Sequence, residues 1–308
     1  MSNKKTSFIA AAVLFVIVLG AGYVGYTQYV IPDQVAKSTN KNVDVLNTNN
    51  QAGKNILDEV TLSVQALESG DSKRLDDALG KLERKQGELD QLSRDTVAAQ
   101  DRLDRGNNTD TQKVHDTAKK SLEKRAKTYQ SLGEFTKFVV CLSKNVQDQT
   151  APFEAVQSIL VKAGADGSDA AATAAAARQA ATEVDKTEKA VAELKLCYVG
   201  GFQSQYTSEL DDDVQQDIKQ CSNFSSGLRQ LADGIEQNNE NSVKTGNQKI
   251  QAAAAQKQVL LDGDSFKKTI TDASGEITKV SYELKEQEDE LDKVFEKVRQ
   301  KYNLDPVK

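Results

Sequence analysis

Hydrophobic residues near the C-terminus recur in alternating steps of three and four, the spacing typical of a coiled-coil helix. The seam consists of Ile277, Val280, Leu284, Gln287, Leu291, Val294 and Val298. Residues 72 to about 104 show a related pattern, with leucine or threonine at every seventh position. Because such a stripe lies along one side of a helix, it is buried only when that helix packs against others. The spacing therefore predicts long helices in bundles or coiled coils.

The composition agrees with an all-α fold of long antiparallel helices. The 308 residues include only 3 prolines and no tryptophan, and 6% are aromatic. Few prolines mean few enforced helix ends, and few large rings make a wide globular core hard to fill. Polar, glycine and proline signals predict about eight helices. The predicted breaks lie at 69–72, 106–108, 150–152, 164–167, 200–201, 238–239 and 262–264.

An N-terminal stretch predicts a transmembrane helix. Residues 7–31 contain no charged side chain, and their 25 residues exceed the roughly 20 that a helix needs to cross the hydrocarbon. Lys4 and Lys5 precede the stretch and three tyrosines lie near its far end, as expected at the two membrane interfaces. We expect a cytoplasmic N-terminus, a single pass through the cell membrane and an extracytoplasmic body. The alternative is a cleaved signal peptide with its apolar region at 8–19.

The chain can be divided into an anchor and three helical regions, two of which resemble each other. Shifting the sequence by 168 residues places Ile56 on Phe224 and Leu82 on Ile250 without a gap. This alignment suggests two duplicated three-helix units. Between them, Asp169 to Ala181 contains nine alanines in thirteen residues, which favours either a slim packed helix or a linker. The predicted ranges are 1–32 for the cytoplasmic tip and anchor, 33–149 for the first bundle, 150–202 for the connector and 203–308 for the second bundle.

The sequence offers little catalytic or metal-binding chemistry. His115 is the single histidine, it lies among charged residues, and no zinc, phosphate-loop or nucleophile-elbow pattern occurs. Carboxylates gather at 211–213 and 262–264, where a solvated turn or helix end accounts for them. We expect no catalytic residues, no metal and no cofactor. A membrane-bound enzyme that uses carboxylates outside known motifs is the remaining enzymatic alternative.

Three cysteines lie in the predicted extracytoplasmic body, where disulfides form readily. If 200–201 is a tight turn, Cys221 lies about 30 Å along the next helix from Cys197, which excludes that pair. Cys141 lies in the most apolar part of the body and is interpreted as a small buried hydrophobic residue. The sequence assigns no disulfide.

The charge excludes one class of partner and leaves two functions. With 40 basic and 46 acidic residues, two of the basic ones before the anchor, the body carries −8, which argues against nucleic acid. We predict a non-catalytic, membrane-anchored scaffold or protein-interaction module. Its partner, or a second copy, would bind the seam residues Ile277, Val280, Leu284, Leu291, Val294 and Val298. The alternative is a ligand-sensing bundle with a separate signalling partner, which resembles the extracytoplasmic part of chemoreceptors in architecture only.

Overall fold

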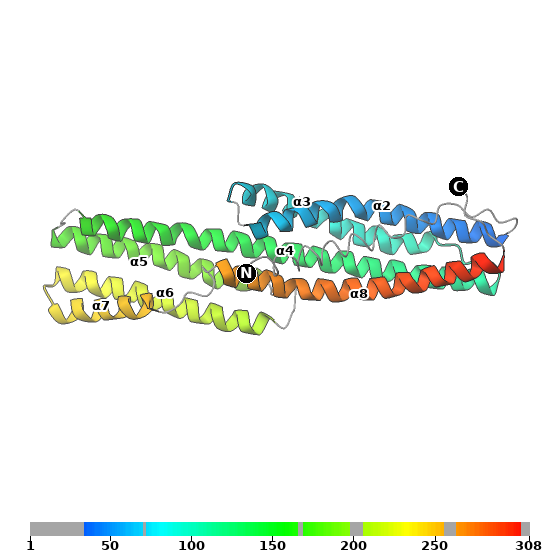
Figure 1. Cartoon of the computed structure of the whole chain (residues 1–308). Coiled ribbons are helices and arrows are strands. Elements are labelled where there is room, and N and C mark those ends of the chain that lie inside the picture. The colour runs from blue at the N-terminus through cyan, green and yellow to red at the C-terminus, as the bar shows by residue number, and fades with distance from the viewer. Residues whose placement is uncertain (1–33, 70–71, 166–168, 198–205, 256–262, 303–308) are drawn as a thin grey trace, which may run out of the picture. The chain divides into compact units, whose positions relative to one another are not determined.

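The computed structural model describes residues 34–69, 72–165, 169–197, 206–255 and 263–302 (Figure 1). These residues form seven α-helices and two short 3-10 helices, with no strand among them, which confirms the all-α prediction. No helix within these ranges is long and apolar enough to cross a membrane, and the predicted anchor at 7–31 lies outside them. The α-helices are α2 (Gln34–Ser69), α3 (Ser72–Ala99), α4 (Thr109–Ala165), α5 (Ala170–Glu193), α6 (Tyr206–Glu236), α7 (Glu240–Ala254) and α8 (Gly263–Lys301). The 3-10 helices are η2 (Gln100–Arg102) and η3 (Leu194–Cys197).

The chain forms two compact units, and both α4 and α8 contribute to each. Of the described residues, those from 34 to 137 and from 271 to 302 form unit 1, and those between 138 and 270 form unit 2. This grouping differs from the predicted ranges, because most of α8 belongs with α2, α3 and the first half of α4 rather than with the rest of 203–308. The difference arises because segments that are distant in sequence pack together. A division of the chain into consecutive ranges cannot represent such packing.

The core of unit 1 lies between α2, α4 and α8. Figure 1 shows the orange and red part of α8 running alongside the first half of α4. Buried apolar side chains from the three helices, with two from the end of the α3–η2 segment, form one cluster. The cluster consists of Val43, Leu46, Ala99, Leu103, Val114, Ala118, Leu122, Leu291, Val294, Phe295 and Val298. Removing this apolar surface from water is the main favourable contribution to the packing of these helices.

The alanine-rich segment is a packed helix of unit 2, not a linker. The Asp169 side chain accepts a hydrogen bond from the Ala172 nitrogen at 2.7 Å, so it caps α5 as its sequence suggests. Alanines on one face of α5 are buried against apolar residues of α4 and α6. Four of them, Ala174, Ala177, Ala180 and Ala181, belong to the core cluster of this unit. Small side chains let neighbouring helices approach closely, which compensates for the small area that each alanine buries.

The predicted helix break at 150–152 is wrong, because α4 continues from Thr109 to Ala165 with Pro152 inside it. A proline in a helix interior removes one backbone hydrogen bond and costs about 3 kcal/mol in isolation. Apolar residues on both sides of Pro152, including Leu142 and Val156, are buried. The packing of the second half of α4 offsets the local cost, and such packing is not visible in a local sequence pattern.

Helices α6 and α7 form a close antiparallel hairpin (Figure 1). A Cβ atom on Gly246 would lie 2.6 Å from the Leu231 nitrogen, and one on Gly234 would lie 2.6 Å from the Val243 nitrogen.

Helix α7 begins at Glu240 and α3 begins at Ser72, so their starts differ by the 168 residues of the predicted repeat. The pair α2–α3 and the pair α6–α7, which the repeat would relate, are unequal, since α3 has 28 residues and α7 has 15. Duplication stays a prediction.

Candidate functional site

The predicted interaction seam faces the interior of unit 1. Five of its six apolar members are buried and Val280 is partly buried. Leu291, Val294 and Val298 belong to the core cluster with residues of α2 and α4. In this structure, then, the heptad pattern of α8 serves packing within the chain. A partner could reach these side chains only if α8 moved away from α2 and α4.

Beside this core, three helices meet at one buried guanidinium. Arg125 of α4 donates from Nε to Glu288 Oε1 of α8 at 2.6 Å, and from Nη1 to the Leu46 carbonyl of α2 at 3.1 Å. The side chains of Arg125 and Glu288 are only 1% and 8% exposed. A buried charge is tolerated when it is paired and hydrogen-bonded, and this pair joins α8 to α4.

Asp292 follows Glu288 by one helical turn and adds a second carboxylate at this place. Its Oδ1 atom is buried and has no hydrogen-bond partner among the described residues. Burial raises the pKa of Asp292 to about 6, and repulsion from Glu288 and Asp289 adds to the effect while Arg125 opposes it. We name Arg125, Glu288 and Asp292 the charge cluster.

Ion pairs at the surface of the same α4–α8 contact have the opposite effect on their carboxylates. Lys124 bonds Glu283 at 2.6 Å, and Lys301 bonds Asp110 at 2.5 Å. The hydrogen bond from Lys124 lowers the pKa of Glu283, and those from Lys301 and Tyr302 lower the pKa of Asp110. The two pairs have opposite polarity, since α4 supplies the base in the first and the acid in the second, and both join α4 to α8.

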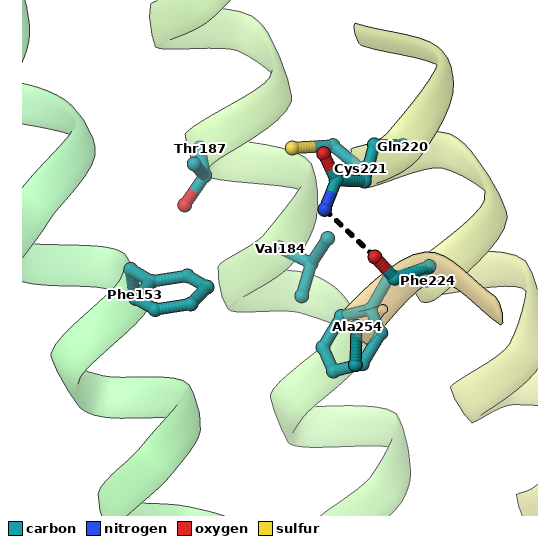
Figure 2. A pocket seen from close by; sticks show the side chains of 8 residues that line it. Phe153, Val184, Thr187, Gln220, Cys221, Phe224 and Ala254 are labelled. Atoms are coloured by element: carbon teal, nitrogen blue, oxygen red, sulfur yellow. Dashed lines mark hydrogen bonds between the residues drawn. The ribbon is translucent and has the colours of Figure 1, made fainter. Parts of the chain in front are cut away.

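Unit 2 contains a small apolar pocket between α4, α5, α6 and the end of α7. Its volume is about 180 Å³. The rings of Phe153 from α4 and Phe224 from α6 enter it from opposite sides, with Val184 of α5 between them (Figure 2). None of its eight lining residues carries a formal charge. Since burying an unpaired ion is costly, the pocket suits an uncharged apolar group.

The polar side chains at this pocket are neutral. Gln220 donates from Nε2 to the Ala253 carbonyl at 2.7 Å, which ties α6 to α7 at the pocket wall (Figure 2). The Cys221 thiol is free and buried, and desolvation raises its pKa to about 12. Because the thiolate is the reactive form, this cysteine is suited to packing rather than to nucleophilic chemistry.

Cys141 of α4 and Cys197 of η3 form a disulfide, with Cα atoms 5.4 Å apart. The interpretation of Cys141 as a plain buried residue is therefore wrong, while the exclusion of a Cys197–Cys221 pair agrees with the structure. The antiparallel packing of α5 on α4 brings together two residues that are 56 apart in sequence. That tertiary contact has no local sequence signal.

The remaining candidates, His115 and Asp211, each contact a charged side chain nearby. His115 Nδ1 lies 2.9 Å from Asp116 Oδ1, and Asp211 pairs with Lys195 at 3.4 Å. Within the described residues, no group of three histidine, cysteine or acidic side chains is arranged to hold a metal ion. The side chains of the second acidic group, 262–264, lie outside the described set.

Sequence reasoning missed the charge cluster, although a signal for it exists. Arg125 lies between Leu122 and Tyr129 in the alternating three and four spacing of α4. A step of four residues after Leu284, in place of the step of three used above, selects Glu288 and not Gln287 as the polar residue of the seam. The structure buries Glu288 more deeply than Gln287. Two opposite charges at core positions of separate helices are the signature of a buried ion pair.

Comparisons of the chain with protein families, curated proteins and solved structures find no match. Its function is therefore argued from its own residues.

Proposed function

We propose that this protein is a non-catalytic, membrane-anchored helical scaffold whose body lies outside the cytoplasm and binds a protein partner. The observation that carries the proposal is the Cys141–Cys197 disulfide. Stable disulfides belong mainly to oxidising compartments such as the periplasm, the secretory lumen and the cell exterior. This agrees with an anchor at 7–31 preceded by Lys4 and Lys5, which would leave the cysteines on the far side of the membrane.

The character of the helical body supports a scaffold rather than an enzyme. The buried Arg125–Glu288 pair is enclosed between helices, where it joins α8 to α4. The pocket of unit 2 is lined without any charged residue that could act as an acid or a base. These features favour a rigid body that presents its outer surface to another protein.

Exposed apolar side chains offer positions from which a partner could be captured. Leu62 and Tyr282 in unit 1, and Val161 and Leu196 in unit 2, are large and exposed. A photoreactive amino acid at each position, in the full chain in its native host, should crosslink to the same protein in repeated experiments. Exposed Thr182 of α5 is a matched control position, since no large apolar side chain is lost there. If none of the four positions gives crosslinks above the background measured at Thr182, the result would count against the scaffold.

A separate measurement tests the compartment. Non-reducing electrophoresis of the chain taken from cells, with free thiols blocked at lysis, should show the Cys141–Cys197 bond intact and Cys221 alone alkylated after unfolding. Protease added outside intact cells or spheroplasts should cleave the body. A fully reduced chain that is protected from protease would overturn the proposed topology.

The pocket of unit 2 favours a second function, the sensing of a small ligand. Its 180 Å³ is close to the roughly 150 Å³ of an engineered apolar cavity that binds benzene. If it is a binding site, indole should raise the thermal unfolding midpoint of the full chain, while the charged analogue indole-3-acetate should not. Val184→Phe would fill the space and abolish the rise. An equal response to indole in the wild type and in Val184→Phe would exclude this site.

A further inference from the structure

The charge cluster places two carboxylates of α8 beside a single guanidinium of α4. Glu288 takes the short hydrogen bond from Arg125 Nε, and the Leu46 carbonyl of α2 takes the one from Nη1. Asp292, one turn further along α8, has a buried Oδ1 atom without a hydrogen-bond partner among the described residues. When all three side chains are ionised, the charge cluster carries one uncompensated negative charge at the contact of three helices.

We propose that proton binding by Asp292 controls how tightly α8 docks on α2 and α4, so that unit 1 closes more firmly in mildly acidic surroundings. A neutral Asp292 leaves the cluster with one cation and one anion in direct contact. An ionised Asp292 adds a partly desolvated charge that repels Glu288, and this repulsion is relieved when α8 detaches and the carboxylate reaches water.

The direction of the pH effect follows from linkage. In the docked state the pKa of Asp292 is about 6, above the ordinary 3.8 that the exposed carboxyl has once α8 detaches. The docked state therefore binds the proton more tightly. The extra stability is complete below about pH 4 and is lost as the pH rises through about 6.

Other charged groups at the contact do not produce this trend. Those acting on Asp292 are Glu288 and Asp289 of α8 and Arg125 of α4, while α2 faces the cluster with the Leu46 carbonyl. Arginine stays charged throughout this range. Glu283 and Asp110, at the edge of the same contact, have lowered pKa values and remain ionised between pH 5 and pH 7.

Hydrogen exchange with mass spectrometry on the full chain in detergent micelles tests the inference. The intrinsic chemical exchange rate at pH 5 and at pH 7 is divided by the rate observed at that pH, which gives protection factors for α8 residues 284–298. In the wild type we expect protection to fall on the order of tenfold from pH 5 to pH 7, since each unit of pKa difference corresponds to a factor of ten. Asp292→Asn, which mimics the protonated form, should keep high protection at both values.

Asp289→Asn is the matched control, because it removes a neighbouring exposed carboxylate of the same helix. Asp289→Asn should retain most of the fall in protection from pH 5 to pH 7. The inference is overturned if Asp292→Asn shows the same fall as the wild type, if the wild type shows none, or if Asp289→Asn abolishes the fall as completely as Asp292→Asn. An equal fall in α5 of unit 2 would also overturn it, since the effect would then not belong to the charge cluster.

Discussion

Arg125 and Glu288 are 163 residues apart in sequence, yet their side chains form a 2.6 Å ion pair inside unit 1. The pair joins the first half of α4 to the second half of α8, and the Leu46 carbonyl extends the contact to α2. We expect the pair to make docking of the C-terminal helix specific, because an apolar stripe alone would tolerate several registers. The stability of unit 1 should therefore depend on both members together.

Arg125→Met should lower the free energy of unfolding of unit 1 by about 3–5 kcal/mol, because it leaves the Glu288 carboxylate buried and unpaired. The double variant Arg125→Met, Glu288→Leu should recover most of that loss, since it removes both charges. Urea unfolding followed by circular dichroism, with hydrogen exchange of α8 to locate the effect, measures both. A double variant as unstable as the single one would show that packing, not the unpaired charge, dominates.

Gly246→Ala should destabilise unit 2 by about 1–3 kcal/mol, although alanine is the better helix former. The added Cβ atom would lie 2.6 Å from the Leu231 nitrogen and 2.8 Å from the Gly227 oxygen, so α6 and α7 would have to separate.

Gly80→Ala in α3 is the matched control, because nothing lies within 4 Å of the Cβ atom that it adds. It should stabilise the chain by about 0.5–1 kcal/mol. Thermal unfolding of the two variants should thus shift in opposite directions, and a stabilising Gly246→Ala would contradict the close approach of α6 to α7.

Cys141→Ser with Cys197→Ser should lower the free energy of unfolding of unit 2 by about 2–4 kcal/mol, because the bond closes a loop of 56 residues in the unfolded chain. Reductant should lower the stability of the wild type by a similar amount and leave the double variant unchanged. Cys221→Ser is the control, since its thiol takes no part in the bond. If reductant does not change the unfolding midpoint of the wild type, the disulfide does not stabilise the chain.

Asp110→Asn should reduce stability at pH 7 by less than about 1 kcal/mol, as expected for an ion pair near the surface. The pKa of Asp110 is lowered below its ordinary 3.8 by Lys301 and Tyr302, so its contribution is present above that pH and is lost as the pH falls through the lowered value. Unfolding midpoints of the wild type and Asp110→Asn should therefore converge as the pH falls below the lowered pKa of Asp110. A difference that persists there would point to lost packing instead of lost charge.

Much of the local structure could be predicted from the pattern of residues. The starts of α3 and α7 follow polar turns at 69–72 and 238–239, and Asp169 caps α5. Helix periodicity and capping act over a few residues, which is why they can be read locally. Pro152 was misinterpreted because its local cost is offset by the burial of residues such as Val156.

The sequence by itself determined that this chain is helical, where most of its helices begin and which stripe of α8 is apolar. Only the tertiary structure decided what meets that stripe within the chain, namely side chains of α2 and α4. It also decided that Glu288 enters the core beside Arg125, and that Cys141 bonds Cys197. The physical reason is that apolar attraction is non-directional. A heptad stripe therefore indicates that its helix must pack against another helix, but it does not identify that helix. Buried charges, close glycine contacts and disulfides make the choice, and they depend on residues brought together from distant parts of the chain.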